Sequence, residues 1–196
     1  MEHALEIFGV VTGLLYLWLE IRQHKVMWIV GFVSSLAYVF VFFFSKIYAM
    51  MALNVYYVVI SVYGFLLWSK QRSETTEEKN VQQETIIYRH LDLSVGLLCG
   101  LAAVLFFGLL YFVLDMFTDS PVALGDGFVT ALSIVATWML AKRILEHWIC
   151  WVVVNVVSSY LYFTQALYPT MFLFFCYAVL AVVGYLNWKK KGVLTV

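Results

Sequence analysis

Seven long apolar segments, separated by shorter polar stretches, divide the chain. Each is close to the ~20 residues that a helix needs to cross a bilayer. None shows the alternation of polar and apolar positions that marks a barrel strand, so all seven are predicted to be transmembrane helices. They lie at about 4–22, 26–45, 47–68, 91–116, 126–144, 147–166 and 169–188.

The polar stretches between these segments differ in length. The connections around Lys46 and Pro169 are so short that the helices on either side must form hairpins. Residues 69–90 are polar, mixed in charge and without an apolar stripe, which predicts a solvated linker, in part helical, with no chemistry of its own. A second polar loop, 115–126, is expected on the other side of the membrane.

Composition places the chain among integral membrane proteins. It is 64% hydrophobic and only 12% charged, with a mean hydropathy of +0.90, whereas soluble domains are about 25% charged. The net charge of zero gives no reason to expect a nucleic-acid partner. The three cysteines lie inside apolar segments without metal-binding spacing, so we read them as core residues and expect no cofactor. The N-terminus has no basic region typical of a cleaved signal.

Lys and Arg predict the orientation, because cytoplasmic loops of membrane proteins are enriched in them. With the N-terminus outside, only Lys46 of the twelve basic residues falls on the outer side. The C-terminus is then cytoplasmic, which agrees with an odd number of spans.

An internal repeat is visible at an offset of 120 residues. This shift pairs six of the seven tryptophans and several other uncommon residues, and such residues rarely match together by chance. The pairs are Trp18 with Trp138, Trp28 with Trp148, Trp68 with Trp188, Tyr48 with Tyr168, Tyr57 with Tyr177, Gly64 with Gly184 and Lys70 with Lys190.

The repeat predicts an all-α architecture of seven transmembrane helices arranged 3+1+3. Repeat one covers about 4–68, the cytoplasmic linker 69–90, the linking helix 91–116 and repeat two about 126–188. The linking helix lets both triplets enter the membrane from the same side, so they are parallel repeats as in SWEET transporters. Such halves place substrate between them, near the middle of the membrane.

The strongest candidate for a binding site lies in the second repeat. Trp148, Trp151 and Asn155 share one face of a helix, because they are three and four positions apart. An amide in an apolar helix costs several kcal/mol unless its hydrogen bonds are satisfied. A neighbouring helix or a ligand could satisfy them, and the two tryptophans favour a ligand.

The first repeat offers smaller polar residues. Asn155 pairs with Ser35 and Trp151 with Gly31, so the two halves differ where the site is expected. Ser34 and Asn54 are further polar residues at membrane depth. Asn54 lies one turn from Tyr57, and Tyr57 and its partner Tyr177 are expected to face the cavity between the repeats, with helix packing as the alternative.

Aromatic rings with amides and hydroxyls, but no buried acid, suit a flat cationic heterocycle. Rings hold such groups by stacking and through their quadrupole, and amides bind ribose hydroxyls or a carboxamide. The candidate set contains no Arg or Lys to hold a phosphate. Phosphorylated forms should therefore be excluded.

The pattern W-x-x-W-x-x-x-N at 148–155, followed by Gln165, Tyr168, Gly184 and Trp188, resembles the PnuC family of bacterial vitamin transporters. The resemblance runs from about Gly9 to Lys190 and is tightest over 148–188. That family imports nicotinamide riboside, and relatives import thiamine or riboflavin. The resemblance implies a bacterial inner-membrane protein whose vitamin is trapped by a cytoplasmic kinase.

No pattern typical of an enzyme is present, and neither a nucleotide motif nor a chain of buried acids offers energy coupling. We therefore expect a uniporter for unphosphorylated nicotinamide riboside in the lipid bilayer. Ser34 and the short amide of Asn54 differ from common nicotinamide riboside members and leave thiamine as the alternative substrate. A seven-helix sensor or scaffold is the alternative from another class. A homo-oligomer is compatible with all these readings.

Overall fold

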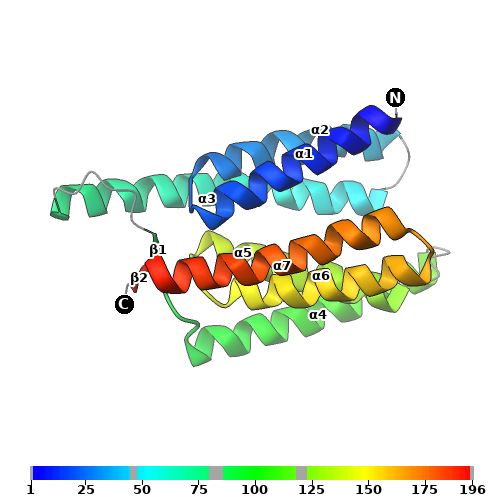
Figure 1. Ribbon diagram of the computed structural model, residues 1–196. Coiled ribbons are helices and arrows are strands. Elements are labelled where there is room, and N and C mark those ends of the chain that lie inside the picture. Colours follow the sequence, from blue (N-terminus) through cyan, green and yellow to red (C-terminus); the bar gives the residue numbers. More distant parts are fainter. Residues whose placement is uncertain (1, 45–47, 80–85, 118–122, 195–196) are drawn as a thin grey trace. The chain divides into compact units, whose positions relative to one another are not determined.

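In a computed structural model that describes residues 2–44, 48–79, 86–117 and 123–194, the described chain forms seven α-helices and two short β-strands. It divides into two compact units, residues 1–86 and 87–196, each described here by itself. In the first unit, α2 packs against both α1 and α3 (Figure 1). These helices are α1 (Glu2–Ile21), α2 (Val26–Phe44) and α3 (Tyr48–Lys79).

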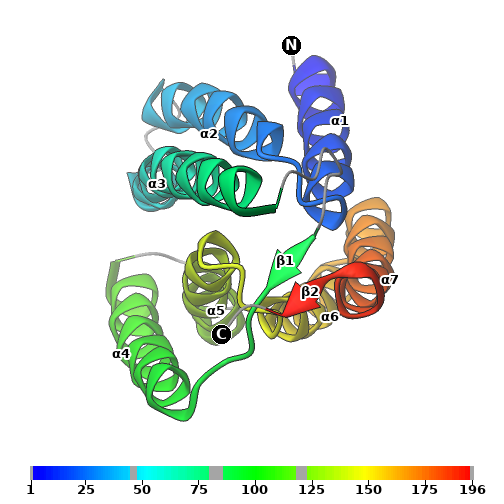
Figure 2. The ribbon, with the colours of Figure 1, turned by 90° about the vertical axis from the view of Figure 1, so that its left-hand side faces the viewer.

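The second unit holds four helices, each of which packs against the next along the chain (Figure 2). They are α4 (Leu93–Phe117), α5 (Ala123–Ala141), α6 (His147–Thr164) and α7 (Tyr168–Lys191). Two-residue strands, β1 (Ile87–Tyr88) and β2 (Val193–Leu194), pair in parallel beside them.

The all-helical fold and the seven helices predicted from hydropathy are confirmed. Five of the described helical segments are long and apolar enough to cross a membrane. They are Val26–Phe44, Met50–Lys70, Leu93–Met116, Ala123–Ala141 and Tyr168–Lys191. The 18-residue α6 is not among them; it carries His147, Asn155 and Ser158, which lower its hydropathy. The 3+1+3 arrangement stays a prediction.

The polar stretch 69–90 contains more structure than a solvated linker. Helix α3 continues into it as far as Lys79, as expected for a segment rich in Glu, Lys, Gln and Arg, which favour helix. Its other end was predicted wrongly, because Ile86 and Tyr88 are buried, with 8% of each exposed. The short apolar run Ile86–Tyr88 was hidden by the polar composition around it.

The backbone repeats at the same offset as the sequence. The turn after α1 has Gln23 at φ 53° and the turn after α5 has Arg143 at φ 56°, both left-handed. In each turn this residue donates its N–H three residues back and the next residue donates five residues back, which is the Schellman ending of a helix. The bonds are Gln23 to Glu20 (2.9 Å), His24 to Leu19 (2.9 Å), Arg143 to Leu140 (2.9 Å) and Ile144 to Met139 (3.0 Å).

Tryptophan packing repeats as well. Trp28 meets Trp68 edge to face with ring centroids 5.5 Å apart, and Trp148 meets Trp188 in the same geometry at 5.7 Å. All four rings are buried. A Cβ placed on Gly64 or Gly184 would collide with the indole of Trp28 or Trp148, respectively. The lack of a side chain at each glycine therefore allows the indole to lie against the helix backbone.

Candidate functional site

Helix α6 carries the candidate residues of the second unit. It begins at His147, directly after the turn that ends α5, and its sequence places Trp148, Trp151 and Asn155 along one face. Ser158 continues this face and is buried with 4% exposed, as Asn155 is with 7%. A line of polar groups thus extends along a helix that is otherwise rich in valine.

Asn155 and Trp151 both carry polar groups that the surrounding protein leaves available. Within the described ranges, no hydrogen bond joins the Asn155 amide to another residue. The indole N–H of Trp151 is buried and also has no acceptor among the described residues. Buried donors without partners are uncommon in folded proteins, but the indole N–H groups of Trp28 and Trp148 share this feature, so for Trp151 it is compatible with a ligand and does not by itself show one.

Trp148 differs from its neighbours on α6 because it is fully buried in side-chain packing. Its ring lies against Trp188, the backbone of Gly184 and the ring of His147, whose centroid is 4.7 Å away. These contacts favour a packing role that positions the start of α6. Its predicted contact with substrate stays a prediction.

On α7, Tyr177 belongs to a group of rings. Its ring meets Phe174 edge to face at 5.8 Å, and Phe174 lies 5.0 Å from Tyr162 of α6. Since α7 packs against α6, the structure brings Tyr177 onto the helix pair that carries Trp151 and Asn155.

The candidates of the first unit come from α2 and α3, which pack together. Ser35 is buried, and the hydroxyl of Ser34 lies 3.4 Å from that of Thr12. The Asn54 amide donates to the carbonyl of Met50 at 2.9 Å. The ring of Tyr57 lies 5.5 Å from that of Tyr56. Whether these residues and those of the second unit serve one substrate stays a prediction.

Sequence reasoning missed several buried polar residues. Glu20 is 3% exposed although it lies at the end of α1. Ser133, Thr137 and Ser158 are also buried. Ser133 and Thr137 donate to backbone carbonyls four residues back, so helix packing accounts for both. Ser158 could have been found from the sequence, because it lies three residues after Asn155 on the same face.

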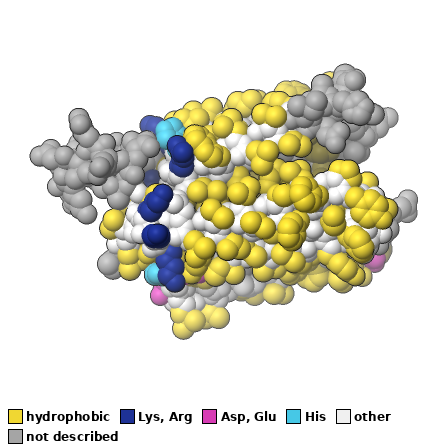
Figure 3. All heavy atoms as spheres, viewed as in Figure 1, with side chains coloured by type: hydrophobic (Ala, Val, Ile, Leu, Met, Phe, Trp, Pro, Cys, Tyr) yellow, Lys and Arg dark blue, Asp and Glu magenta, His cyan; other side chains and the backbone are white. Residues whose placement is uncertain are grey.

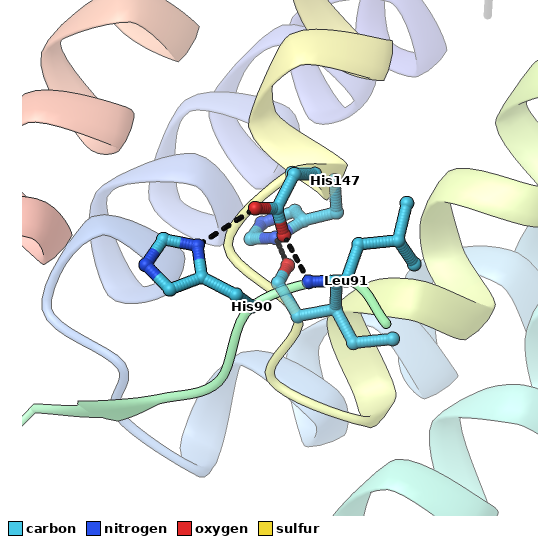
Figure 4. Close-up of polar contacts among 5 residues, drawn as sticks. His90, Leu91 and His147 are labelled. Carbon is cyan, nitrogen blue, oxygen red and sulfur yellow. Dashed lines mark hydrogen bonds and ion pairs between the residues drawn. The ribbon is translucent and has the colours of Figure 1, made fainter. Parts of the chain in front are cut away.

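A carboxylate joins the start of α6 to the end of the 69–90 segment (Figure 4). One oxygen of Glu146 lies 2.8 Å from Nδ1 of His90, and the other accepts the N–H of Leu91 at 2.8 Å. The backbone of Arg89 bonds to Arg143 and Leu145 in the same turn. Segment 87–91 is thus a strap across the ends of α5, α6 and α7, where β1 also pairs with β2.

Surface chemistry agrees with a membrane setting. In Figure 3 hydrophobic side chains cover much of the visible surface, while Lys and Arg gather toward one end of the helices. In the second unit these basic residues follow α5 or end α7. They are Lys142, Arg143, Lys189, Lys190 and Lys191. Among the described residues, no group of three or more His, Cys, Asp or Glu side chains could hold a metal ion.

The chain matches the model of a transporter family, described as "Nicotinamide mononucleotide transporter", over residues 3–190. It belongs to this family. The resemblance seen in the α6 motif is thereby confirmed, and the chain is a multi-pass membrane transporter, not an enzyme.

Two curated relatives of this PnuC-family chain are named nicotinamide riboside transporter PnuC. The protein of Escherichia coli is 23% identical over 96% of this chain and 86% of its own length. That of Neisseria mucosa is 28% identical over 92% of this chain and 70% of its own length. A crystal structure of the vitamin B3 transporter PnuC superposes with a TM-score of 0.70 at 24% identity, over 95% of this chain and 81% of that one, which supports the fold.

Proposed function

We propose that this PnuC-family protein is a facilitative transporter that imports unphosphorylated nicotinamide riboside. The observation that carries the proposal is on α6, where the buried residue Asn155 lies one turn from the buried indole N–H of Trp151, and neither has a hydrogen-bond partner among the described residues. The names of the Escherichia coli and Neisseria mucosa relatives support the choice of substrate.

The residues would divide the work by chemistry. The Trp151 ring stacks on the pyridinium and attracts its charge. Asn155 bonds the carboxamide or a ribose hydroxyl, and Trp148 positions the start of α6 by packing on Trp188. Tyr57, Tyr177, Asn54, Ser34 and Ser35 supply the remaining ring faces and polar groups.

Transport would be uniport, made directional inside the cell. A cytoplasmic kinase would phosphorylate the vitamin, and the phosphorylated product could not return because the candidate residues include no Arg or Lys. The basic ends of α5 and α7 support a cytoplasmic C-terminus and an outer N-terminus in the bacterial inner membrane.

Calorimetric titration of the purified protein tests the substrate. We expect nicotinamide riboside to bind and its mononucleotide not to bind. Thiamine is the second candidate, favoured by the shorter side chains of Ser34 and Asn54. Saturable binding of thiamine alone would transfer the proposal to thiamine, while tight binding of the mononucleotide would overturn the exclusion of phosphate.

A further inference from the structure

The position equivalent to Trp151 in the first unit is Gly31, and a ring from another helix occupies the space beside it. A Cβ on Gly31 would lie 3.0 Å from Cε2 of Tyr16 on α1 and 3.2 Å from the hydroxyl of Ser61 on α3. The Tyr16 ring therefore packs directly over the backbone of α2. The absence of a side chain at Gly31 makes room for the large ring of Tyr16.

At the equivalent positions of the second unit, the large and the small side chains are exchanged. At the offset of 120 residues, Tyr16 corresponds to Ala136 and Ser61 to Ala181. Both alanines are buried, with 0% and 1% exposed. Each unit thus has one large ring in this set of three positions, which comes from α1 in the first unit and from α6 in the second. Because protein interiors are close-packed, such an exchange keeps the filled volume similar.

Several polar groups surround the phenol of Tyr16. Its phenol lies within range of electrostatic interaction with Tyr56, Tyr57 and the carboxyl group of Glu20. Tyr57 is already a candidate for contact with substrate. The Tyr16 ring and the Ser61 hydroxyl therefore meet beside Gly31, where the ring covers the backbone of α2, and the phenols of Tyr56 and Tyr57 lie near that of Tyr16.

We propose that Tyr16 contacts the transported vitamin and helps to determine which vitamin is accepted. It is the counterpart in the first unit of Trp151, and this inference rests on the proposed role of Trp151. A phenol ring can stack on a flat cationic heterocycle, and its hydroxyl can donate to or accept from a substrate hydroxyl. The substrate class it suits is a hydroxyl-bearing cationic nucleoside such as nicotinamide riboside.

Three variants of the full chain test this, with uptake by proteoliposomes and competition by thiamine as the measurements. Tyr16→Ala should raise KM for nicotinamide riboside at least tenfold and lower the preference for it over thiamine. Tyr16→Phe should keep stacking and change KM less than fivefold. The double variant Tyr16→Ala/Gly31→Trp moves a ring back into this space from α2 and should recover part of the lost affinity.

Trp18→Ala is the matched control, because this ring is on the same helix, is 49% exposed and stacks on Arg22 at 4.1 Å. It should leave KM and the substrate preference unchanged. A merely structural role for Tyr16 would reduce the amount of folded transporter and scale uptake of both vitamins equally, which overturns the inference.

A folded Tyr16→Ala protein with normal KM, beside a Trp151→Ala protein that has lost binding, would overturn the role of Tyr16 and leave the proposed function intact. If Tyr16→Ala does not fold, Tyr16→Leu takes its place, and a folded Tyr16→Leu protein with a normal KM and an unchanged substrate preference overturns the inference. A wild-type protein that binds neither vitamin would instead refute the proposed function itself.

Discussion

At the scale of single residues, the function depends on polar groups that the fold buries without partners. Asn155 is 7% exposed, and its amide has no bond to another described residue. An amide in this position would cost free energy in the empty protein, and a ligand that satisfies it recovers that cost.

Asn155→Leu should abolish uptake and leave the protein folded, because the change removes a ligand bond and no described internal one. The measurement is uptake by proteoliposomes together with the elution profile in detergent. Val156→Leu, on an exposed side of α6, is the control and should behave as wild type. A monodisperse Asn155→Leu protein that transports at the normal rate would contradict the assignment, and an aggregated one would show that the amide joins helices.

Trp151→Ala should weaken binding by about 1–3 kcal/mol, since it removes both stacking and attraction for a cation, while Trp151→Phe should be partly tolerated. Titration calorimetry with nicotinamide riboside and with a neutral analogue of the same shape measures both effects. The wild type should prefer the charged form. Equal affinities for the charged and the neutral form would show that the Trp151 ring contributes only shape and apolar contact, without attraction for the charge.

At the scale of helices, close packing at two glycines sets how α2 meets α3 and how α6 meets α7. The indoles of Trp28 and Trp148 lie directly against the backbone at Gly64 and Gly184. Small residues are common where membrane helices approach closely, since lipid offers no hydrophobic driving force and packing must stabilise the contact. The orientation of α6, and with it the direction of Trp151 and Asn155, depends on this contact.

Gly184→Ala should destabilise the protein by about 1–3 kcal/mol, the usual range for an overpacked core, and Gly64→Ala should act similarly. Gly100→Ala is the matched control, because a Cβ there meets nothing within 4 Å and alanine favours helix. Thermal unfolding in detergent is the measurement. If all three variants melt alike, the indoles can move aside and the contacts do not determine the helix packing.

At the scale of the whole molecule, the central question is what drives the substrate across the membrane. The chain has no nucleotide-binding motif, and its family is one of transporters. Glu20 is a buried acid that the sequence reading did not anticipate, so it is a candidate residue for a proton-coupled mechanism. The charge of the substrate provides a way to separate uniport from proton coupling.

For a uniporter, uptake of a cationic vitamin into proteoliposomes should stop at equilibrium, and an inside-negative potential should raise the plateau. Moving one charge through 100 mV is worth about 2.3 kcal/mol. Clamping the potential with valinomycin should remove this gain, and dissipating a pH gradient at fixed potential should change nothing. Accumulation driven by the proton gradient alone would contradict uniport, and Glu20→Gln would be the first variant to test.

The sequence by itself determined the membrane class, the seven helices, the repeat and the face of α6 that carries Trp151 and Asn155. These features depend on hydropathy over a helix length and on the spacing of uncommon residues, and both are properties of the chain in one dimension. The family resemblance also came from such spacing.

Only the tertiary structure decided which of these side chains are buried in contacts with other side chains. It placed Trp148 against Gly184 and Trp188, put Tyr16 over Gly31, and tied His90 and Leu91 to Glu146. Each of these contacts joins residues that are distant in the chain, so no local sequence pattern predicts them. Packing between helices determines whether an aromatic or a polar group meets protein or remains available to a ligand.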